Sequence, residues 1–467
     1  MDKKQSKQLF PFKSGENDYI FTPGNVSIYQ VPPLYYEIAT LWQDDAMDIQ
    51  NMMMGTLSSR YDGALIGLAV QKLQTMLNTP PSSREETETH VPGLKEIHLQ
   101  VSHVCNLNCK YCYAEGGNYG GPSLKMDQKT ARQAVDYFLQ SLPEGTVGDL
   151  SFDGGEPLTN WDIIQEVVDY GEKKAREQNK RLFFFIGTNG TLLNKSTHSL
   201  IKNKRLGVGI SIDGDADTQD ANRKYRNNKG SYSTLSRNIK DFISHIGNQN
   251  LQARSTITRH NLKVSETVKH LLSLNLMHLY LDPVSSTDPH WQLTPAELEI
   301  INNEFTLLAD FYAKTLLEGK IFIIRNFYLF IKRLHFKKKL FYKCGVGRSG
   351  VAITPKGDIF PCYRFASVPS YRMGNIFEQG INRSFQQQFI DNRVDDRAGC
   401  NTCWARYLCG GGCPYHAVYK QGDIYKNDHQ ECQFLLHLVE LSLQIYIRVK
   451  NSKPQFWDFF FKTVNQR

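Results

Sequence analysis

The stretch VSHVCNLNCKYCYAEGGNYGG, residues 101–121, holds three cysteines within eight positions. Cys105, Cys109 and Cys112 are separated by three and two residues, so a single loop can present three thiolates to one metal centre. Metal sites usually have a further ligand, and no other Cys or His follows nearby. The spacing therefore predicts either a [4Fe–4S] cluster with one iron free of protein ligands or a zinc site whose fourth ligand is distant.

The composition around this loop is that of an ordinary globular protein. The chain has 467 residues, 40% of them hydrophobic and 22% charged, with a formal net charge of +8. This length predicts about two to four domains. The start, MDKKQSKQLFPF, lacks the apolar stretch of a signal peptide, and apolar runs such as LFFFI (182–186) are too short to span a bilayer. We expect a cytoplasmic protein, in which ten cysteines indicate metal or cluster ligation rather than disulfides.

The region from 95 to 284 alternates between apolar runs of strand length and amphipathic helical segments. The helical segments include 127–142 and 162–178. Such alternation predicts an α/β fold with a parallel sheet, open or partly closed like a barrel, and functional residues at the carboxyl ends of its strands. The predicted strands are 96–102, 149–154, 181–188, 206–213, 252–258 and 278–284.

Polar and glycine residues follow the first three of these strands. Cys105 comes after the first, Gly154-Gly155-Glu156 after the second, and Thr188-Asn189-Gly190 after the third. Because carboxyl ends of parallel strands meet at one edge of a sheet, we expect these residues to lie close together.

The N-terminal region combines short β-type runs with helical patterns. The runs 9–13, 17–23 and 26–31 are punctuated by glycine and proline. Three helical patterns follow, and then a polar, proline-rich segment that we interpret as a linker. The helical patterns are 34–43, 46–55 and 64–77, and the linker is 79–93.

The sequence Cys105-Asn-Leu-Asn-Cys109-Lys-Tyr-Cys112, followed by Gly154-Gly155-Glu156-Pro157, resembles the radical S-adenosylmethionine (AdoMet) enzymes. In that family the free iron chelates the methionine amino and carboxylate groups of AdoMet. One electron then cleaves a C–S bond and yields a 5′-deoxyadenosyl radical that takes hydrogen from substrate. The resemblance implies a partial (β/α)6 TIM-like barrel over 94–320.

The same resemblance implies which residues surround AdoMet. Tyr111 would lie beside the adenine, and Arg223 and Arg254 are candidates for holding the carboxylate in bidentate fashion. Each assignment has a structural alternative. The Gly-Gly pair could be only a turn, a Ser or Thr at a strand end only a cap, and an Arg only part of a surface ion pair. The other candidates are Gly154, Gly155 and Glu156 at the amino group, Thr188 and Asn189 along the wall, and Ser211 and Asp213 at the ribose.

Seven more cysteines lie in a glycine-rich C-terminal region. Their pattern resembles the SPASM extension of peptide- and protein-modifying radical AdoMet enzymes, which implies two auxiliary [4Fe–4S] clusters within 321–450, followed by a tail at 451–467. A pair of zinc sites is the alternative, because Cys-x2-Cys is a common zinc element. By the resemblance, one cluster is held by Cys400, Cys403, Cys409 and Cys432, and the other by Cys344, Cys362 and Cys413.

The second of these clusters would keep one position without a cysteine. Water, Asp or His could fill it, and so could a substrate thiolate, which suits iron–sulfur iron. In sulfatase-maturing relatives a carboxylate base follows the equivalent of Cys362, whereas this chain has no Asp or Glu between Cys362 and Gly374. The segment looks more like that of thioether-forming maturases, and the sequence names no general base.

The N-terminal region, 1–78, resembles the winged-helix-like precursor-peptide recognition domain of ribosomal-peptide maturases. Such a domain binds a leader peptide as an added strand. The run 26–31 is the candidate edge strand, although it could also be interior. The basic segment 331–343 predicts a solvated amphipathic helix face; a surface for an acidic peptide is the alternative, with nucleic acid a weaker one.

The expected function is therefore reductive cleavage of AdoMet coupled to thioether formation in a ribosomally made precursor peptide. The machinery also fits carbon–carbon cross-linking, epimerisation or residue oxidation. A metal-stabilised, non-catalytic peptide adaptor is the alternative from another class. We expect an external electron donor, flavodoxin or ferredoxin, and neither nucleic acid nor membrane as a partner.

Overall fold

The N-terminal region folds as a small sheet covered by helices. The computed structural model describes residues 8–42, 55–78 and 93–465. Strands β1 (Phe10–Ser14), β2 (Asn17–Thr22) and β3 (Ser27–Val31) form an antiparallel sheet in the order β1-β2-β3, so β3 lies at an edge, as expected. Helices α1 (Pro33–Leu41) and α3 (Gly63–Asn78) confirm two of the predicted helices. The remaining predicted helix, 46–55, lies outside the described residues except for residue 55, and so does most of the linker.

The six strands predicted between 95 and 284 all form, and they stand side by side in chain order. Every neighbouring pair is parallel, which confirms the α/β prediction. Strand β10 (Ile323–Ile324) adds a parallel neighbour at one end. The six are β4 (Glu96–Ser102), β5 (Val147–Gly154), β6 (Arg181–Thr188), β7 (Gly207–Ser211), β8 (Leu251–Ile257) and β9 (His278–Pro283).

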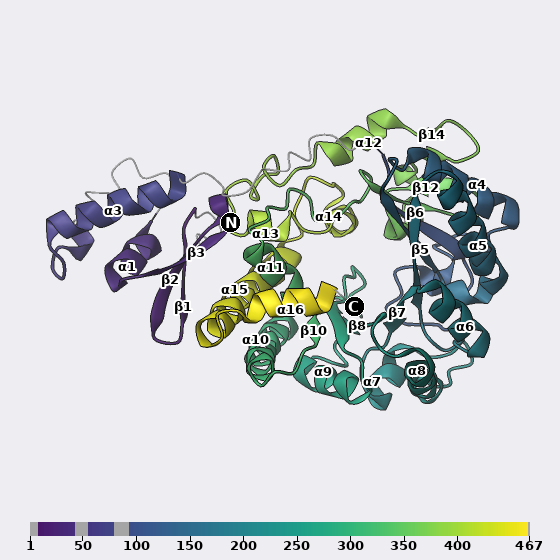
Figure 1. Ribbon diagram of the computed structural model, residues 1–467, viewed down its shortest axis with the longest axis horizontal. Helices are drawn as coiled ribbons and strands as arrows, with labels where there is room; N and C mark the ends of the chain where they lie inside the picture. The colour runs from purple at the N-terminus through teal and green to yellow at the C-terminus, as the bar shows by residue number, and fades with distance from the viewer. Residues whose placement is uncertain (1–7, 43–54, 79–92, 466–467) are drawn as a thin grey trace.

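Amphipathic helices cover the outer face of this sheet (Figure 1). In α8, for example, Leu235, Ile239 and Phe242 recur at helical spacing and are fully buried. The helices between the strands and after them are α4 (Gln128–Ser141), α5 (Trp161–Glu177), α6 (Lys195–Lys204), α7 (Ala216–Asn222), α8 (Tyr232–Ile246), α9 (Val264–Ser273) and α10 (Pro295–Leu317).

The sheet continues into the cysteine-rich region, across the boundary expected at 320. Strand β11 (Gly350–Ile353) pairs in parallel with β4 and carries three short antiparallel strands. These are β12 (Asp358–Phe360), β13 (Gly374–Asn375) and β14 (Gly380–Ile381). The helices here are α11 (Arg325–His335), α12 (Arg383–Ile390), α13 (Arg406–Cys409), α14 (Pro414–Gln421), α15 (His429–Ser452) and α16 (Phe456–Asn465).

The basic segment 331–343 is helical only in its first part, so the prediction of a helix face is wrong beyond residue 335. Helix α11 ends at His335, and Lys337 has a φ of 51°, which does not continue a right-handed helix. Lys337 and Lys338 are exposed, whereas Arg333 turns inward and donates to the Leu408 carbonyl at 2.6 Å.

The N-terminal sheet is packed directly against the cysteine-rich region. The Phe10 ring stacks on Trp404, with 3.6 Å between centroids, and Phe21 meets the edge of the same indole. Asn451 on α15 donates to the Tyr19 hydroxyl at 2.7 Å. Figure 1 shows this sheet beside α15 and α16. Because these aromatic side chains share one buried core with the barrel, the N-terminal region is an integral part of the molecule.

Among the described residues, none of the helices is long and apolar enough to cross a membrane.

Candidate functional site

The three-cysteine loop lies at the carboxyl end of β4 and is held by the segment after α7. Asn108 donates its backbone N–H to the Lys224 carbonyl at 2.8 Å. Arg226 donates to the carbonyls of Cys105 and Gly116 at 2.8 and 3.0 Å, which ties the two ends of the loop together. These contacts fix a loop whose helical structure is limited to one short 3-10 turn, Glu115–Gly117, and its three cysteines line one cavity.

The thiols of this loop are buried close to one another. Burial is the main cause that raises the pKa of Cys105 to about 12 and the pKa of Cys109 to about 11, and neighbouring thiols of the loop act in the same direction. Buried thiols such as Cys105 and Cys109 ionise readily only when a cation neutralises them. The donor set therefore fits a thiolate-ligated metal group.

The Gly154-Gly155 pair allows the ends of β4 and β5 to meet. Gly154 has a φ of 136°, and a Cβ there would lie 2.2 Å from the Ser102 carbonyl oxygen. A Cβ on Gly155 would lie 2.7 Å from the Val104 carbonyl oxygen. Only glycine fits at either position, and the bare backbone of both residues forms part of the cavity wall.

The Glu156 side chain is turned away from the cavity and is fully buried. Its carboxylate accepts hydrogen bonds from the Thr188 hydroxyl at 2.7 Å and from the Asn189 N–H at 2.7 Å. The Leu158 N–H donates to it at 3.1 Å. Burial raises the pKa of this carboxyl despite these bonds. Glu156 thus fixes the loop after β6 that carries Thr188 and Asn189.

Like Glu156, Asp213 is a buried carboxylate that holds neighbouring side chains in place, in this case Tyr111 and Arg223. Its fully buried carboxylate accepts from the Tyr111 hydroxyl at 2.7 Å and lies 3.9 Å from the Arg223 guanidinium. The Thr256 N–H and the Asn222 amide also donate to it. Burial raises the pKa of Asp213, and the guanidinium of Arg223 opposes that rise. The carboxylate therefore orients Tyr111 and Arg223.

The ten AdoMet candidates all lie at the carboxyl end of the sheet. The side chains of Glu156 and Asp213 lie behind the cavity wall, as described above. Arg223 lies beside Cys109, whereas Arg254 lies 5.7 Å from the Tyr280 ring, in the aromatic half of the cavity. The eight candidates that line the cavity are Tyr111, Gly154, Gly155, Thr188, Asn189, Ser211, Arg223 and Arg254.

Several cavity residues were not found by reasoning from the sequence. The segment after Cys362 holds no carboxylate before Gly374, whereas two carboxylates reach the cavity from other strands, Asp153 from β5 and Asp282 from β9. Asp153 stands at the end of a predicted strand, directly before Gly154, and this position could have identified it from the sequence as a candidate for the cavity. The other missed aromatic and charged residues are Tyr113, Tyr280, Tyr363, Arg364 and Tyr415.

Asp153 is paired with a buried histidine. His98 Nδ1 lies 2.5 Å from Asp153 Oδ2, and His98 Nε2 lies 3.0 Å from Glu96 Oε1. Burial disfavours the imidazolium, but the two carboxylates outweigh it and raise the pKa of His98 well above its ordinary value. The His98 imidazolium thus forms an ion pair with Asp153 and orients its side chain at the cavity wall.

The seven C-terminal thiols gather in two groups. Burial raises the pKa of Cys413, and Cys344 and Cys362 contribute to the rise; Cys432 is affected in the same way by Cys400, Cys403 and Cys409. These are the two sets that the resemblance implies. All ten cysteines lie in the described residues, and none forms a disulfide.

Two polar side chains stand close to Cys413. The Glu431 carboxylate accepts from the Cys413 N–H at 3.1 Å, and His416 lies 3.4 Å from it. Burial opposes ionisation of Glu431, but His416 lowers its pKa to about 2. An Asp or His at the open cluster position is one expectation, and His416 reaches this region through its contact with Glu431.

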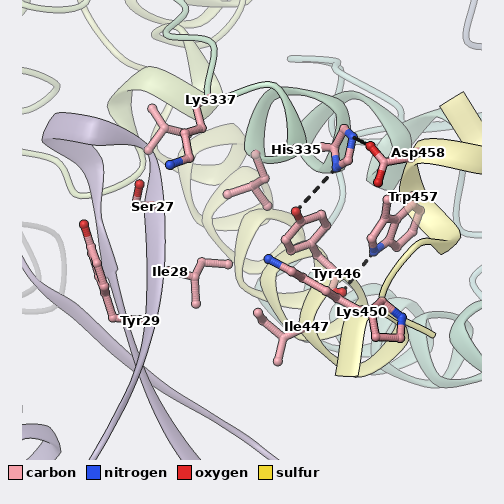
Figure 2. Close-up of a pocket in the computed structure, with 13 residues that line it drawn as sticks. Ser27, Ile28, Tyr29, His335, Lys337, Tyr446, Ile447, Lys450, Trp457 and Asp458 are labelled. Carbon is pink, nitrogen blue, oxygen red and sulfur yellow. Dashed lines mark hydrogen bonds and ion pairs between the residues drawn. The ribbon is translucent and has the colours of Figure 1, made fainter. Parts of the chain in front are cut away.

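A groove of about 370 Å³ runs between β3 and the C-terminal helices. Figure 2 shows Ile28 of β3 pointing across it toward Ile447, with Lys450 and Lys337 at its rim. On the far wall the Trp457 indole donates to the Tyr446 carbonyl at 3.0 Å. Beyond β2, no described strand pairs with β3. The groove thus combines an open strand edge, an apolar floor and two lysines.

Comparison with known proteins bears on the central and C-terminal regions. Residues 99–259 match the radical SAM superfamily, and residues 344–404 match the iron–sulfur cluster-binding SPASM domain. The chain thus has the α/β radical SAM fold followed by a cysteine-rich SPASM domain.

Three individual proteins illustrate the range of similarity. An uncharacterized protein of Methanocaldococcus jannaschii is 36% identical over 193 residues, 41% of this chain and 63% of that protein's own length. A cysteine-type anaerobic sulfatase-maturating enzyme of Clostridium novyi is 28% identical, covering 69% of this chain and 88% of the enzyme. The structure of Streptococcus suis SuiB bound to its precursor peptide SuiA has a TM-score of 0.51 at 15% identity, covering 92% of this chain and 99% of SuiB.

Proposed function

We propose that this chain is a radical AdoMet enzyme that installs thioether cross-links in a ribosomally made precursor peptide. The observation that carries the proposal is one cavity lined both by the three-cysteine loop and by side chains from the cysteine-rich region, including Tyr363 and Arg364 beside Cys362. A substrate in this cavity would lie between the three-cysteine loop and the cysteine-rich region. An external flavodoxin or ferredoxin is the proposed electron donor.

The residues of the cavity have distinct roles in holding the cofactors. Cys105, Cys109 and Cys112 would ligate a [4Fe–4S] cluster, and the backbone of Gly154 and Gly155 would face the AdoMet amino group. When bound, the clusters and AdoMet supply one-electron chemistry that removes a hydrogen atom from substrate and accepts an electron as the C–S bond forms. Tyr111 and Arg223, oriented by Asp213, would line the adenine and carboxylate ends. Seven further cysteines would hold two auxiliary clusters.

Asp153 is the proposed proton acceptor. Thioether formation releases the thiol proton of the substrate cysteine, which needs a base in the cavity. Asp153 lines the cavity, and its ion pair with His98 orients its side chain. Glu96 holds the other ring nitrogen of His98, so the imidazole cannot turn away. Asp153, His98 and Glu96 would thus accept and hold the thiol proton. No carboxylate from the segment that follows Cys362 in the sequence is needed.

Oxidation of a protein cysteine is the second candidate function. The similarity to the cysteine-type sulfatase-maturating enzyme of Clostridium novyi favours it. It differs in outcome, since oxidation replaces the sulfur, whereas a cross-link retains it. Carbon–carbon cross-linking and epimerisation leave the thiol free.

Mass spectrometry of a co-expressed peptide tests the reaction type. A short cysteine-containing peptide encoded beside this gene should lose about two mass units per bond and become resistant to thiol alkylation. The peptide expressed without the enzyme is the control. A modified peptide whose thiol still reacts would contradict thioether formation, and loss of sulfur would favour oxidation. Absence of both modification and AdoMet cleavage in the iron-loaded protein would favour a non-catalytic adaptor.

The groove beside β3 is the proposed site for the leader of the precursor peptide, within a winged-helix-like recognition domain at 1–78. An extended peptide could add to the open edge of β3 through main-chain hydrogen bonds. Ile28 and Ile447 offer an apolar contact, and Lys337 and Lys450 favour acidic residues in the leader.

Charge reversal at the groove should weaken leader binding. In Lys337→Glu with Lys450→Glu, we expect peptide affinity to fall by about 10-fold or more, because two attractive charges become repulsive. Fluorescence anisotropy of a labelled leader peptide measures this, and AdoMet cleavage without peptide should not change. Lys356→Glu, at an exposed turn far from the groove, is the matched control. Equal affinity in all three proteins would rule out this groove.

A further inference from the structure

A second cluster of metal-binding side chains lies on the outside of the barrel, away from all ten cysteines. His198 is on α6, and Asp241 and His245 are one turn apart on α8. One ligand atom from each residue can be chosen so that all three lie within 4.8 Å of one another. Figure 1 shows α6 and α8 as neighbours on the outer face of the sheet.

His198 has an unusual environment for a polar side chain. It is 5% exposed, and neither ring nitrogen has a hydrogen-bond partner. The ring packs edge-on against Phe242, and its Nδ1 faces Asp241 Oδ2 at 3.6 Å, too long for a hydrogen bond. Buried polar groups are almost always paired, so an unpaired imidazole aimed at a carboxylate indicates a missing partner between them.

We propose that His198, Asp241 and His245 bind a divalent transition-metal ion, with Zn²⁺ as the favoured species. Asp241 Oδ2 lies 3.6 Å from His198 Nδ1, and the other carboxylate oxygen, Oδ1, lies 3.4 Å from His245 Nδ1. These separations approach the edge of a tetrahedron whose metal–ligand bonds are about 2.0–2.1 Å. Two imidazoles and one carboxylate suit zinc better than Mg²⁺ or Ca²⁺, which prefer oxygen ligands.

The neighbouring groups are compatible with a cation at this position. His245 Nδ1 currently lies 2.8 Å from the Asp241 carbonyl, and its ring is half exposed, so it can turn toward a metal at little cost. Lys202, the nearby cation on α6, donates to the His245 carbonyl at 3.2 Å, and the charge of Asp241 offsets it. Burial lowers the pKa of His198, which favours the neutral imidazole that metals require.

Such an ion would connect α6 to α8 and thereby support the cavity wall. Asn238 on α8 donates to the carbonyls of Gly190 and Thr191 at 3.0 and 3.1 Å, in the loop that follows Asn189. Fixing α8 to α6 would therefore stabilise this loop. The site is structural in character, with a fourth position left for water.

Metal analysis of the full-length, anaerobically prepared and iron-loaded protein tests the proposal. Iron occupies the cysteines, so after incubation with Zn²⁺ and desalting we expect about one zinc per chain. In Asp241→Asn with His245→Gln, both partly exposed positions, zinc should be lost while the iron content stays unchanged. Amide hydrogen exchange in α6 and α8 should slow on zinc addition in the wild type and not in the variant.

The control is His270→Gln on α9, a histidine bonded to the Tyr232 hydroxyl and outside the cluster. It should keep its zinc. Absence of zinc from the wild type would overturn the proposal. So would zinc that persists in the double variant, since it would then be held by thiols.

Discussion

Replacing Cys105, Cys109 and Cys112 together by alanine is expected to abolish formation of 5′-deoxyadenosine. Without the three thiolates, no iron is left in the cavity to bind AdoMet or to reduce it. Iron content should fall from about twelve to about eight per chain, because the other seven cysteines form two separate groups. Chromatography of the reaction products and iron analysis of anaerobic samples measure the two effects.

The matched control for this variant is Cys413→Ala. It removes a thiol from the group with Cys344 and Cys362, which is separate from the three-cysteine loop. AdoMet cleavage should persist in Cys413→Ala, while peptide product is lost. If the triple variant still makes 5′-deoxyadenosine, the assignment of the loop is wrong. If Cys413→Ala loses both activities, the two groups do not have separate roles.

Asp153→Asn is expected to lower the rate of peptide cross-linking by about 10²- to 10⁴-fold, the usual contribution of a general base. Asparagine keeps the shape of the side chain and loses both the proton-accepting charge and the ion pair with His98 at 2.5 Å. AdoMet cleavage without coupling to product should continue, because Asp153 is not among the proposed cluster ligands. Parallel measurement of product and 5′-deoxyadenosine separates the two.

Asp282→Asn is the comparison for Asp153→Asn. Asp282 also lines the cavity, but it lies beside Tyr280 and Arg364 and has no histidine partner among the described residues. We expect a smaller effect there. A larger loss in Asp282→Asn than in Asp153→Asn would transfer the role of base to β9. Unchanged cross-linking in both would remove carboxylates from the mechanism.

Periodicity along the sequence was enough to predict the central fold. The six strands from β4 to β9 are short apolar runs between amphipathic helices, and each formed within a few residues of its predicted bounds. Such patterns depend on neighbours in the chain, since side-chain alternation decides which face is buried. The basic segment 331–343 shows the limit, because a left-handed residue at Lys337 ended the helix early.

The sequence by itself determined the donor set, the positions of the strands and the glycine pair at the end of β5, because these depend on local spacing and steric fit. The tertiary structure alone decided which distant groups meet. His98 reaches Asp153 only because β4 and β5 are adjacent, and Phe10 reaches Trp404 only because the N-terminal sheet packs on the cysteine-rich region. The approach of His198 to Asp241 likewise depends on how α6 packs against α8. Contacts of this kind leave no periodic signal in the sequence, since they arise from packing between elements.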